Sequence, residues 1–153
     1  MSQLTPEIKP KEGYGEIPFG VASESVIEYL GEAEEIEDIE DEDVFNTIIM
    51  NYWDQGLSVF MEGIEKSVVA CFETEHPEST LFGERIFDMD EIQITELMSS
   101  KGYEIAETEI DETGEKRLSY DDAMIDFFLE DGELIAVNWG VLVNEKGEIE
   151  EMP

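Results

Sequence analysis

The 153-residue sequence has only one cysteine and one histidine. The single cysteine excludes a disulfide within the chain and a cysteine-rich zinc site, and the single histidine excludes a multi-histidine metal centre. Basic residues are also scarce, because 8 Lys and Arg stand against 41 Asp and Glu, which leaves a formal net charge of −33. Nucleic-acid backbones and anionic membranes repel such a chain, so we expect it to bind neither.

Long hydrophobic runs are absent as well. No stretch of about 18 apolar residues exists that could span a membrane. The segment 1–20 has neither the basic start nor the apolar core of a secretory signal, so we expect a soluble, cytoplasmic protein. A hydrophobic content of 41% with 10% aromatics is nevertheless ordinary for a globular domain, which argues against a wholly disordered chain.

Catalytic motifs are missing too. The sequence has no phosphate-binding loop, no dinucleotide-binding glycine pattern, no G-x-S-x-G and no H-E-x-x-H. Cys71 stands in an apolar run, where we expect it to be buried, and His76 precedes Pro77 in what reads as a linker. Carboxylates are too common for any pair to indicate acid–base catalysis. We therefore expect no enzyme activity, no cofactor and no metal.

The acidic residues are spread along the whole chain. Residues 1–77 hold 19 acids and 3 bases, and residues 78–153 hold 22 acids and 5 bases. The densest run, Glu32–Asp43, has nine acids in twelve residues; it is either a solvated loop or a strip that docks a basic partner. If it docks a partner, its candidate contact residues are Glu37, Asp38, Glu40 and Asp41.

An internal repeat is indicated when the chain is aligned with itself at a shift of 68 residues. The segment 14–71 then matches 82–139 without gaps. The identical pairs include Tyr52/Tyr120, Asp54/Asp122, Phe60/Phe128 and Val69/Val137, and apolar positions agree around them. We therefore predict an N-terminal extension at 1–13, a first unit at 14–77 and a second unit at 78–153, which share a core or a joined sheet.

Each unit is predicted to begin with a short helix. In the first unit the helix spans Ser23–Leu30, with Ser23 as its N-cap and Gly31 as its stop. Its apolar face contains Val26, Ile27 and Leu30. In the second unit Asp90 caps a helix that ends near Gly102, with an apolar face of Ile94, Leu97 and Met98.

An antiparallel β meander is predicted after each helix and its acidic connection. Asp131-Gly132 is a strong two-residue hairpin signal, and Asn144–Gly147 suggests a last turn. The fold class is therefore α+β. The predicted strands are Thr47–Trp53, Leu57–Met61, Ser67–Phe72, Leu118–Asp122, Ala123–Leu129 and Leu134–Val143.

The opening of the first unit resembles a known group of small domains. Gly15–Gly20, followed by Ser23, Val26 and Leu30–Ala33, is similar to the start of domains of the SmpA/OmlA and β-lactamase-inhibitor-protein type. The resemblance implies a helix before an antiparallel sheet, units in tandem as in the inhibitor protein, and binding to other proteins. The sequence departs from the group at Ala33, where proline is usual, and in having one cysteine, whereas the inhibitor is disulfide-bonded.

These observations favour a non-enzymatic domain that binds a basic protein, in its most concrete form an immunity or antitoxin-like inhibitor. The alternative is a structural or housekeeping domain without a dedicated partner, acidic for solubility or salt tolerance. The aromatic candidates are either core or interface residues, and Asp54 and Asp122 are either strand-end carboxylates or matching acidic spots on one face. Oligomeric state is left open. Besides the acidic run, the candidate partner-binding residues are Tyr52, Trp53, Asp54, Tyr120, Asp122 and Trp139.

Overall fold

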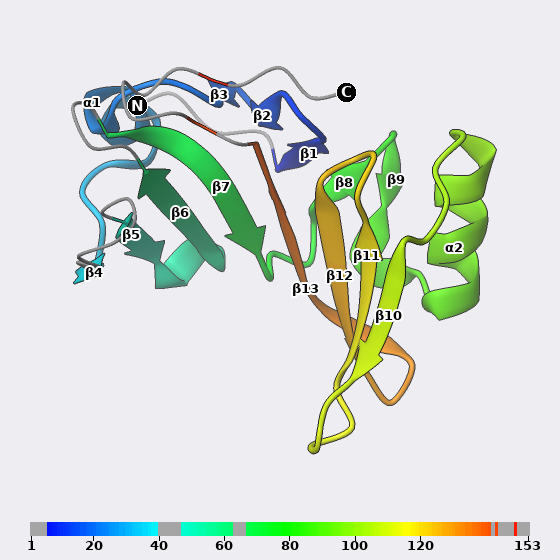
Figure 1. Ribbon diagram of the computed structural model, residues 1–153. Helices are drawn as coiled ribbons and strands as arrows, with labels where there is room; N and C mark the ends of the chain where they lie inside the picture. The colour runs from blue at the N-terminus through cyan, green and yellow to red at the C-terminus, as the bar shows by residue number, and fades with distance from the viewer. Residues whose placement is uncertain (1–5, 40–46, 63–66, 142, 144–148, 150–153) are drawn as a thin grey trace.

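The structure is a computed structural model that describes residues 6–39, 47–62, 67–141, 143 and 149. Within these residues two α-helices and two short 3-10 helices accompany an eight-stranded sheet and a five-stranded sheet. The predicted α+β class is therefore confirmed. Figure 1 shows the large sheet as an arch, with the two helices and the small sheet outside it.

The large sheet has the order β10-β11-β12-β13-β7-β6-β5-β4, and each neighbouring pair is antiparallel. It consists of two four-stranded meanders that meet where β13 pairs with β7, which we call the seam. One helix precedes each meander along the chain. The first meander is β4 (Glu35–Ile39), β5 (Thr47–Tyr52), β6 (Leu57–Glu62) and β7 (Val68–Thr74), and the second is β10 (Glu107–Ile110), β11 (Lys116–Tyr120), β12 (Ile125–Glu130) and β13 (Glu133–Gly140).

The small sheet has the order β3-β2-β1-β8-β9 and brings together segments far apart in the sequence. Its central strand β1 is antiparallel to β2 and parallel to β8. Part of the segment expected to be an N-terminal extension, residues 1–13, is therefore an integral strand. The strands are β1 (Glu7–Lys9), β2 (Gly13–Tyr14), β3 (Ile17–Pro18), β8 (Thr80–Leu81) and β9 (Glu84–Arg85).

Helix α1 spans Ser23–Leu30, as predicted, and ends at Gly31, whose φ of 79° suits a residue without a side chain. The prediction that Ser23 is the N-cap is wrong. Ala22 occupies the N-cap position in an extended conformation, and no side chain caps the helix. Of the predicted apolar face, Val26 is buried, whereas Ile27 is 40% exposed.

Helix α2 spans Glu91–Ser100, and its predicted N-cap is confirmed. The Asp90 carboxylate accepts a hydrogen bond from the Gln93 backbone N–H at 2.9 Å, and the Gln93 side-chain oxygen accepts one from the Asp90 backbone N–H at 3.0 Å. This reciprocal capping box satisfies two backbone donors at the start of the helix. Ile94 and Met98 are buried on its inner face, as the spacing predicted.

The predicted strands are present with boundaries moved by a few residues, and the Asp131-Gly132 hairpin is confirmed by positive φ at both positions. The loop interpretation of the acidic run is wrong for Glu35–Ile39, because this segment pairs along its length with β5. The predicted turn at Asn144–Gly147 lies outside the described residues. Two 3-10 helices, η1 (Trp53–Gln55) and η2 (Ile86–Asp88), were not predicted.

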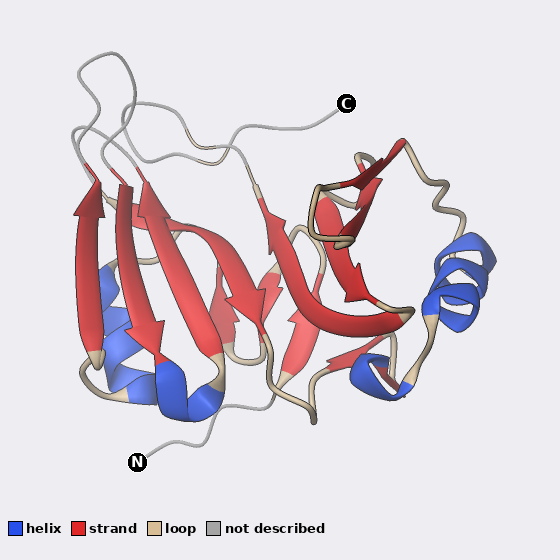
Figure 2. Ribbon diagram, turned by 90° about the horizontal axis from the view of Figure 1, so that it is seen from below, coloured by secondary structure: helices blue, strands red, loops and turns tan. Residues whose placement is uncertain are grey.

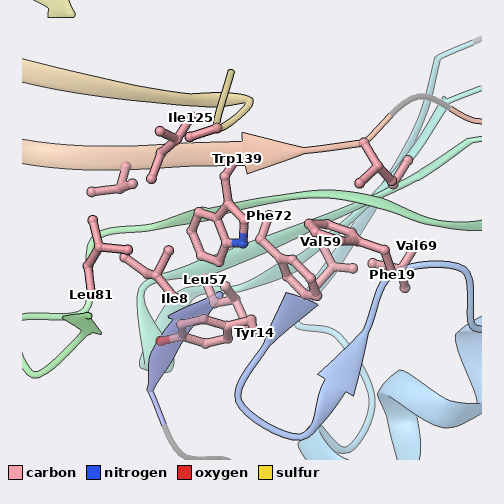
Figure 3. Packing of buried hydrophobic residues seen from close by; sticks show 14 of the residues in the cluster. Ile8, Tyr14, Phe19, Leu57, Val59, Val69, Phe72, Leu81, Ile125 and Trp139 are labelled. Carbon is pink, nitrogen blue, oxygen red and sulfur yellow. The ribbon is translucent and has the colours of Figure 1, made fainter. Parts of the chain in front are cut away.

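The hydrophobic core lies between the two sheets and is centred on the seam (Figure 3). Phe72 of β7 and Trp139 of β13 stand opposite each other, with ring centroids 5.5 Å apart. Tyr14 of β2 packs against both rings, at 5.8 and 5.4 Å. The Trp139 indole N–H donates to the Gly13 carbonyl at 2.9 Å. One aromatic cluster therefore ties both meanders to the small sheet.

Candidate protein-interaction surface

The large sheet has one buried face and one open face. In β6 every second residue from Leu57 to Met61 is buried, and the residues between them are half-buried. The same alternation occurs in β12 over Ile125–Leu129. Figure 2 shows helix α1 behind β4, β5 and β6, so that the viewer looks at the side of these strands that no helix covers.

We define the open face by the strand registers, which carry this alternation from strand to strand. For example, Phe60 stands opposite both Ile49 and Cys71, and Cys71 stands opposite Gly140. The open face comprises Glu35, Glu37, Ile49, Asn51, Ser58, Phe60, Glu62, Cys71, Glu73, Glu107, Glu109, Arg117, Ser119, Asp126, Phe128, Ala136, Asn138 and Gly140.

The charge of this open face is strongly one-sided. Arg117 is the one basic residue in the set. Because the other charged members are all acidic, the field over the face is negative and attracts cationic groups. The carboxylates are Glu35, Glu37, Glu62, Glu73, Glu107, Glu109 and Asp126.

The middle of the open face lies at the seam. Glu73 of β7 stands opposite Asn138 of β13. The Cys71 thiol donates to the Asn138 side-chain oxygen, with 3.2 Å between Sγ and Oδ1. A shallow cavity of about 290 Å³ adjoins these groups and is lined by Glu62, Cys71, Asp126 and Asn138, among others.

Burial and negative charge raise several pKa values at the seam. Burial raises the pKa of the Cys71 thiol to about 12, and the charges of Glu62 and Glu73 raise it further. Burial also raises the pKa of Glu62 and that of Glu73 above their ordinary value, while a hydrogen bond with Asn138 partly opposes this for Glu73. The thiol is consequently protonated at neutral pH and is a poor nucleophile.

The second half of the open face contains a bound guanidinium. Arg117 of β11 places one terminal nitrogen 2.8 Å from Glu109 and 3.9 Å from Glu107, both on β10. Phe128 stands opposite Arg117 on the next strand, and the two line a shallow cavity of about 160 Å³ together with Glu109. Hydrogen bonding and repulsion from Glu109 raise the pKa of Glu107, and the charge of Arg117 lowers it.

The first half has the same outer acids without the cation. Glu37 stands opposite Ile49, and Phe60 stands on the far side of Ile49. Asn51, which is 2% exposed, donates from its amide to Glu37 at 2.9 Å and accepts from the Ser58 hydroxyl at 2.8 Å. A neutral amide therefore supplies the hydrogen bond that Arg117 supplies to Glu109 in the other half.

The aromatic candidates divide between core and surface. Tyr52, Tyr120 and Trp139 are at most 2% exposed and belong to the core, so a partner cannot touch them. Trp53 is 57% exposed at the start of η1 and stays a surface candidate. The neighbouring tyrosine and tryptophan, Tyr52 and Trp53, thus differ because the strand ends between them.

The acidic candidates are less fully described. Glu37 is exposed on the open face, and Asp122 is exposed in the turn between β11 and β12. Asp38 lies in β4 and Asp54 in η1, but their side chains are outside the described part of the structure. Glu40 and Asp41 lie outside the described residues altogether. Of this group, only Glu37 is placed on the open face.

Most carboxylates of the open face were not singled out from the sequence. Glu62, Glu73 and Asp126 come from different strands, and only the registers bring them to one side of the sheet. The available signal was the alternation of apolar and polar residues in Leu57–Glu62 and Ile125–Glu130. Cys71, expected to be buried, is half-buried on this open face.

Other expected chemistry was also tested on the described residues. His76 lies between β7 and β8, where its Nδ1 accepts a hydrogen bond from the Glu78 backbone N–H at 3.1 Å. Among the described residues no group of three or more His, Cys, Asp and Glu side chains could hold a metal ion. The same residues include no helix with the length and apolar character needed to cross a membrane.

Comparisons with known protein families and with curated proteins find no match. Among solved structures, the fold is similar to an extracellular protein containing a SCP domain from Bacillus anthracis str. Ames, with 13% sequence identity and a TM-score of 0.47. The match covers 87% of this chain but spans about half, 49%, of the other one. A likeness this weak assigns neither a family nor a function to the chain.

Proposed function

We propose that this chain is a non-enzymatic acidic domain that binds a basic protein on the open face of its large sheet. The observation that carries the proposal is the imbalance on that face, where seven carboxylates accompany a single arginine. A net charge of −33 adds a long-range attraction that speeds the encounter with a cationic partner. An immunity or antitoxin-like inhibitor of a basic protein is its most concrete form.

The chemistry of the open face supports binding over catalysis. Its thiol has a pKa of about 12 and donates a hydrogen bond to Asn138, so it is not poised as a nucleophile. The face is broad and shallow, and it offers half-buried side chains such as Phe60 and Phe128 between its acids. Apolar contact surrounded by charge is typical of protein interfaces.

We also propose that the chain is a tandem of two related units, residues 14–77 and 78–153. Several features recur 68 residues apart: the first helical residues Ser23 and Glu91, the first residues of β6 and β12, and the β-bulges that follow Phe60 and Phe128. The resemblance to tandem inhibitor domains agrees with such an arrangement.

The spacing is not constant, however, so a gap-free match is too simple. Glu37 and Glu109, which occupy the same register position, are 72 residues apart. In the last strand of each meander the corresponding residues, Cys71 and Ala136, are 65 apart. Val69 and Val137 are therefore not equivalent in the strand registers. The proposed units differ by insertions before and after their central hairpins.

Binding can be tested by capture with the purified chain from the lysate of its source, at low salt and with elution by a salt step. The proposal predicts one stoichiometric basic protein, whose affinity for the purified chain falls as ionic strength rises. Scattered cationic proteins in its place would indicate a non-specific ion exchanger and would favour the housekeeping alternative.

A matched pair of variants tests the surface. The triple variant Glu62→Gln, Glu73→Gln and Asp126→Asn removes three charges from the open face. The control triple Glu24→Gln, Glu28→Gln and Glu96→Gln removes three charges from exposed helix positions. We expect the first to weaken binding of the captured protein by about tenfold or more and the control to weaken it much less. Equal losses would show that only net charge matters.

A further inference from the structure

The two halves of the open face differ at one position in otherwise equivalent rows. In the second half, Glu109, Arg117 and Phe128 follow one another across β10, β11 and β12. In the first half, Glu37, Ile49 and Phe60 follow one another across β4, β5 and β6. Only the middle residue changes in kind, from a cation to an apolar side chain.

The neighbouring register positions extend the similarity. Glu107 stands opposite Ser119 in the second half, and Glu35 stands opposite Asn51 in the first. Each half thus presents two glutamates, two residues apart, on the edge strand of the sheet. The second half shows how this arrangement holds a guanidinium, at 2.8 and 3.9 Å from the two carboxylates.

The first half has no such cation. Among the described residues the structure gives no ion pair to Glu35 or Glu37, and both side chains are exposed. The Asn51 amide bonds one oxygen of Glu37, which leaves further acceptor positions on the carboxylates of the edge strand. A planar guanidinium fits such acceptors better than a compact ammonium, because its N–H groups are fixed in a fork.

We propose that the first half of the open face docks an arginine side chain of a basic protein partner, between Glu35 and Glu37 and over Ile49 and Phe60, as the second half holds Arg117. The proposal rests on the proposed function, whose site it specifies. The partner contributes the cation that Ile49 does not, and the exposed edges of Ile49 and Phe60 pack against the arginine stem.

The test uses a peptide of six arginines with blocked ends, titrated into the purified full-length chain at about 20 mM salt, where surface charges are weakly screened. Binding is measured by calorimetry, and its position by amide chemical shifts. We expect the strongest shifts in β4, β5 and β6, and an affinity about fivefold or more above that for six lysines. Equal affinities for the two peptides would remove the argument for a guanidinium site.

Charge-matched variants locate the site. The double variant Glu35→Gln and Glu37→Gln should weaken peptide binding about tenfold, whereas the control Glu24→Gln and Glu28→Gln on helix α1 should change it less than twofold. Similar losses in both variants, or none in either, would overturn the proposed site. The proposed function would survive that result, because it depends on whether a basic protein binds the face at all.

Exchanging the middle residue provides a second readout. Ile49→Arg should fill the first site from within the chain and abolish the shifts in β4, β5 and β6. Arg117→Ile should open the second site, so that the peptide also shifts β10, β11 and β12. If Ile49→Arg folds normally by circular dichroism and still binds the peptide at the same strands, the proposal is wrong.

Discussion

The two halves of the open face have similar backbones and different electrostatics. In the half formed by β10, β11 and β12, Arg117 neutralises part of the charge of Glu107 and Glu109. In the half formed by β4, β5 and β6, Glu35 and Glu37 have only the Asn51 amide as a described side-chain donor. A folded sheet evidently tolerates either arrangement, so the uncompensated half is available for a function that the other half does not have.

The comparison extends to the buried tyrosines behind the sheet. Tyr52 donates from its hydroxyl to the Gly31 carbonyl at 2.9 Å and so ties β5 to the end of helix α1. Tyr120 occupies the corresponding place in β11, but its hydroxyl is buried without a hydrogen-bond partner. The second half therefore has a better compensated surface and a less well satisfied core than the first.

The largest expected effect comes from breaking the seam that joins the halves. Trp139→Ala removes the ring that packs on Phe72 and Tyr14 and the hydrogen bond to Gly13, so we expect the free energy of unfolding to fall by about 3–5 kcal/mol. Chemical denaturation followed by circular dichroism measures the loss. Trp53→Ala, at a 57% exposed position, is the matched control and should cost far less.

The tyrosine pair gives the next largest effect. Tyr52→Phe leaves the Gly31 carbonyl without its donor and should cost about 1 kcal/mol, whereas Tyr120→Phe removes a buried hydroxyl that has no partner and should be neutral or stabilising. The two substitutions delete the same atom from equivalent strands. Equal losses in urea denaturation would mean that Tyr120 has a hydrogen bond in solution and that the two cores do not differ.

A smaller effect is expected from the carboxylates at the seam. Burial raises the pKa of Glu62 and that of Glu73 in the folded chain. Because a raised carboxyl pKa means that ionisation disfavours the folded state, their cost is fully present above the folded pKa and disappears as the pH falls below the unfolded pKa. Glu62→Gln and Glu73→Gln should each raise the melting temperature at neutral pH.

The pH dependence separates this burial effect from a mere change in net charge. The gain from Glu62→Gln and Glu73→Gln should shrink towards about pH 4, where the wild-type carboxyls become protonated. Glu24→Gln removes one charge from an exposed helix position and is the control. An equal gain from Glu24→Gln at neutral pH would attribute the effect to general repulsion among 33 net charges.

Local signals predicted much of the fold. Asp90 with Gln93, Gly31, and Asp131-Gly132 each act within a few residues, so the helix start, the helix stop and the hairpin could be predicted without tertiary information. Strand β4 could not, because Glu35–Ile39 is a strand only through its pairing with β5. Repulsion among its acids favours a loop until that pairing is formed.

The candidate surface was harder to predict than the fold. The sequence alternation shows that one side of β6 and of β12 is polar, but it does not say which strands lie beside them. The registers place Glu62, Glu73 and Asp126 on one face, and they place Tyr52, Tyr120 and Trp139 on the other. The sequence therefore predicted an acidic, aromatic-containing sheet correctly in composition but assigned several residues to the wrong side.

The smallest expected effect concerns the position at which the two halves differ. Arg117→Ile removes a surface ion pair and should cost about 0.2–1 kcal/mol, and Ile49→Arg should gain a similar amount by pairing with Glu35 and Glu37. Both changes should diminish as salt rises, because the groups involved are substantially exposed. Denaturation at low and high salt measures them. If Ile49→Arg loses stability at low salt while the sheet stays intact, Glu35 and Glu37 do not hold a guanidinium as Glu107 and Glu109 do, and the two halves are alike in backbone only.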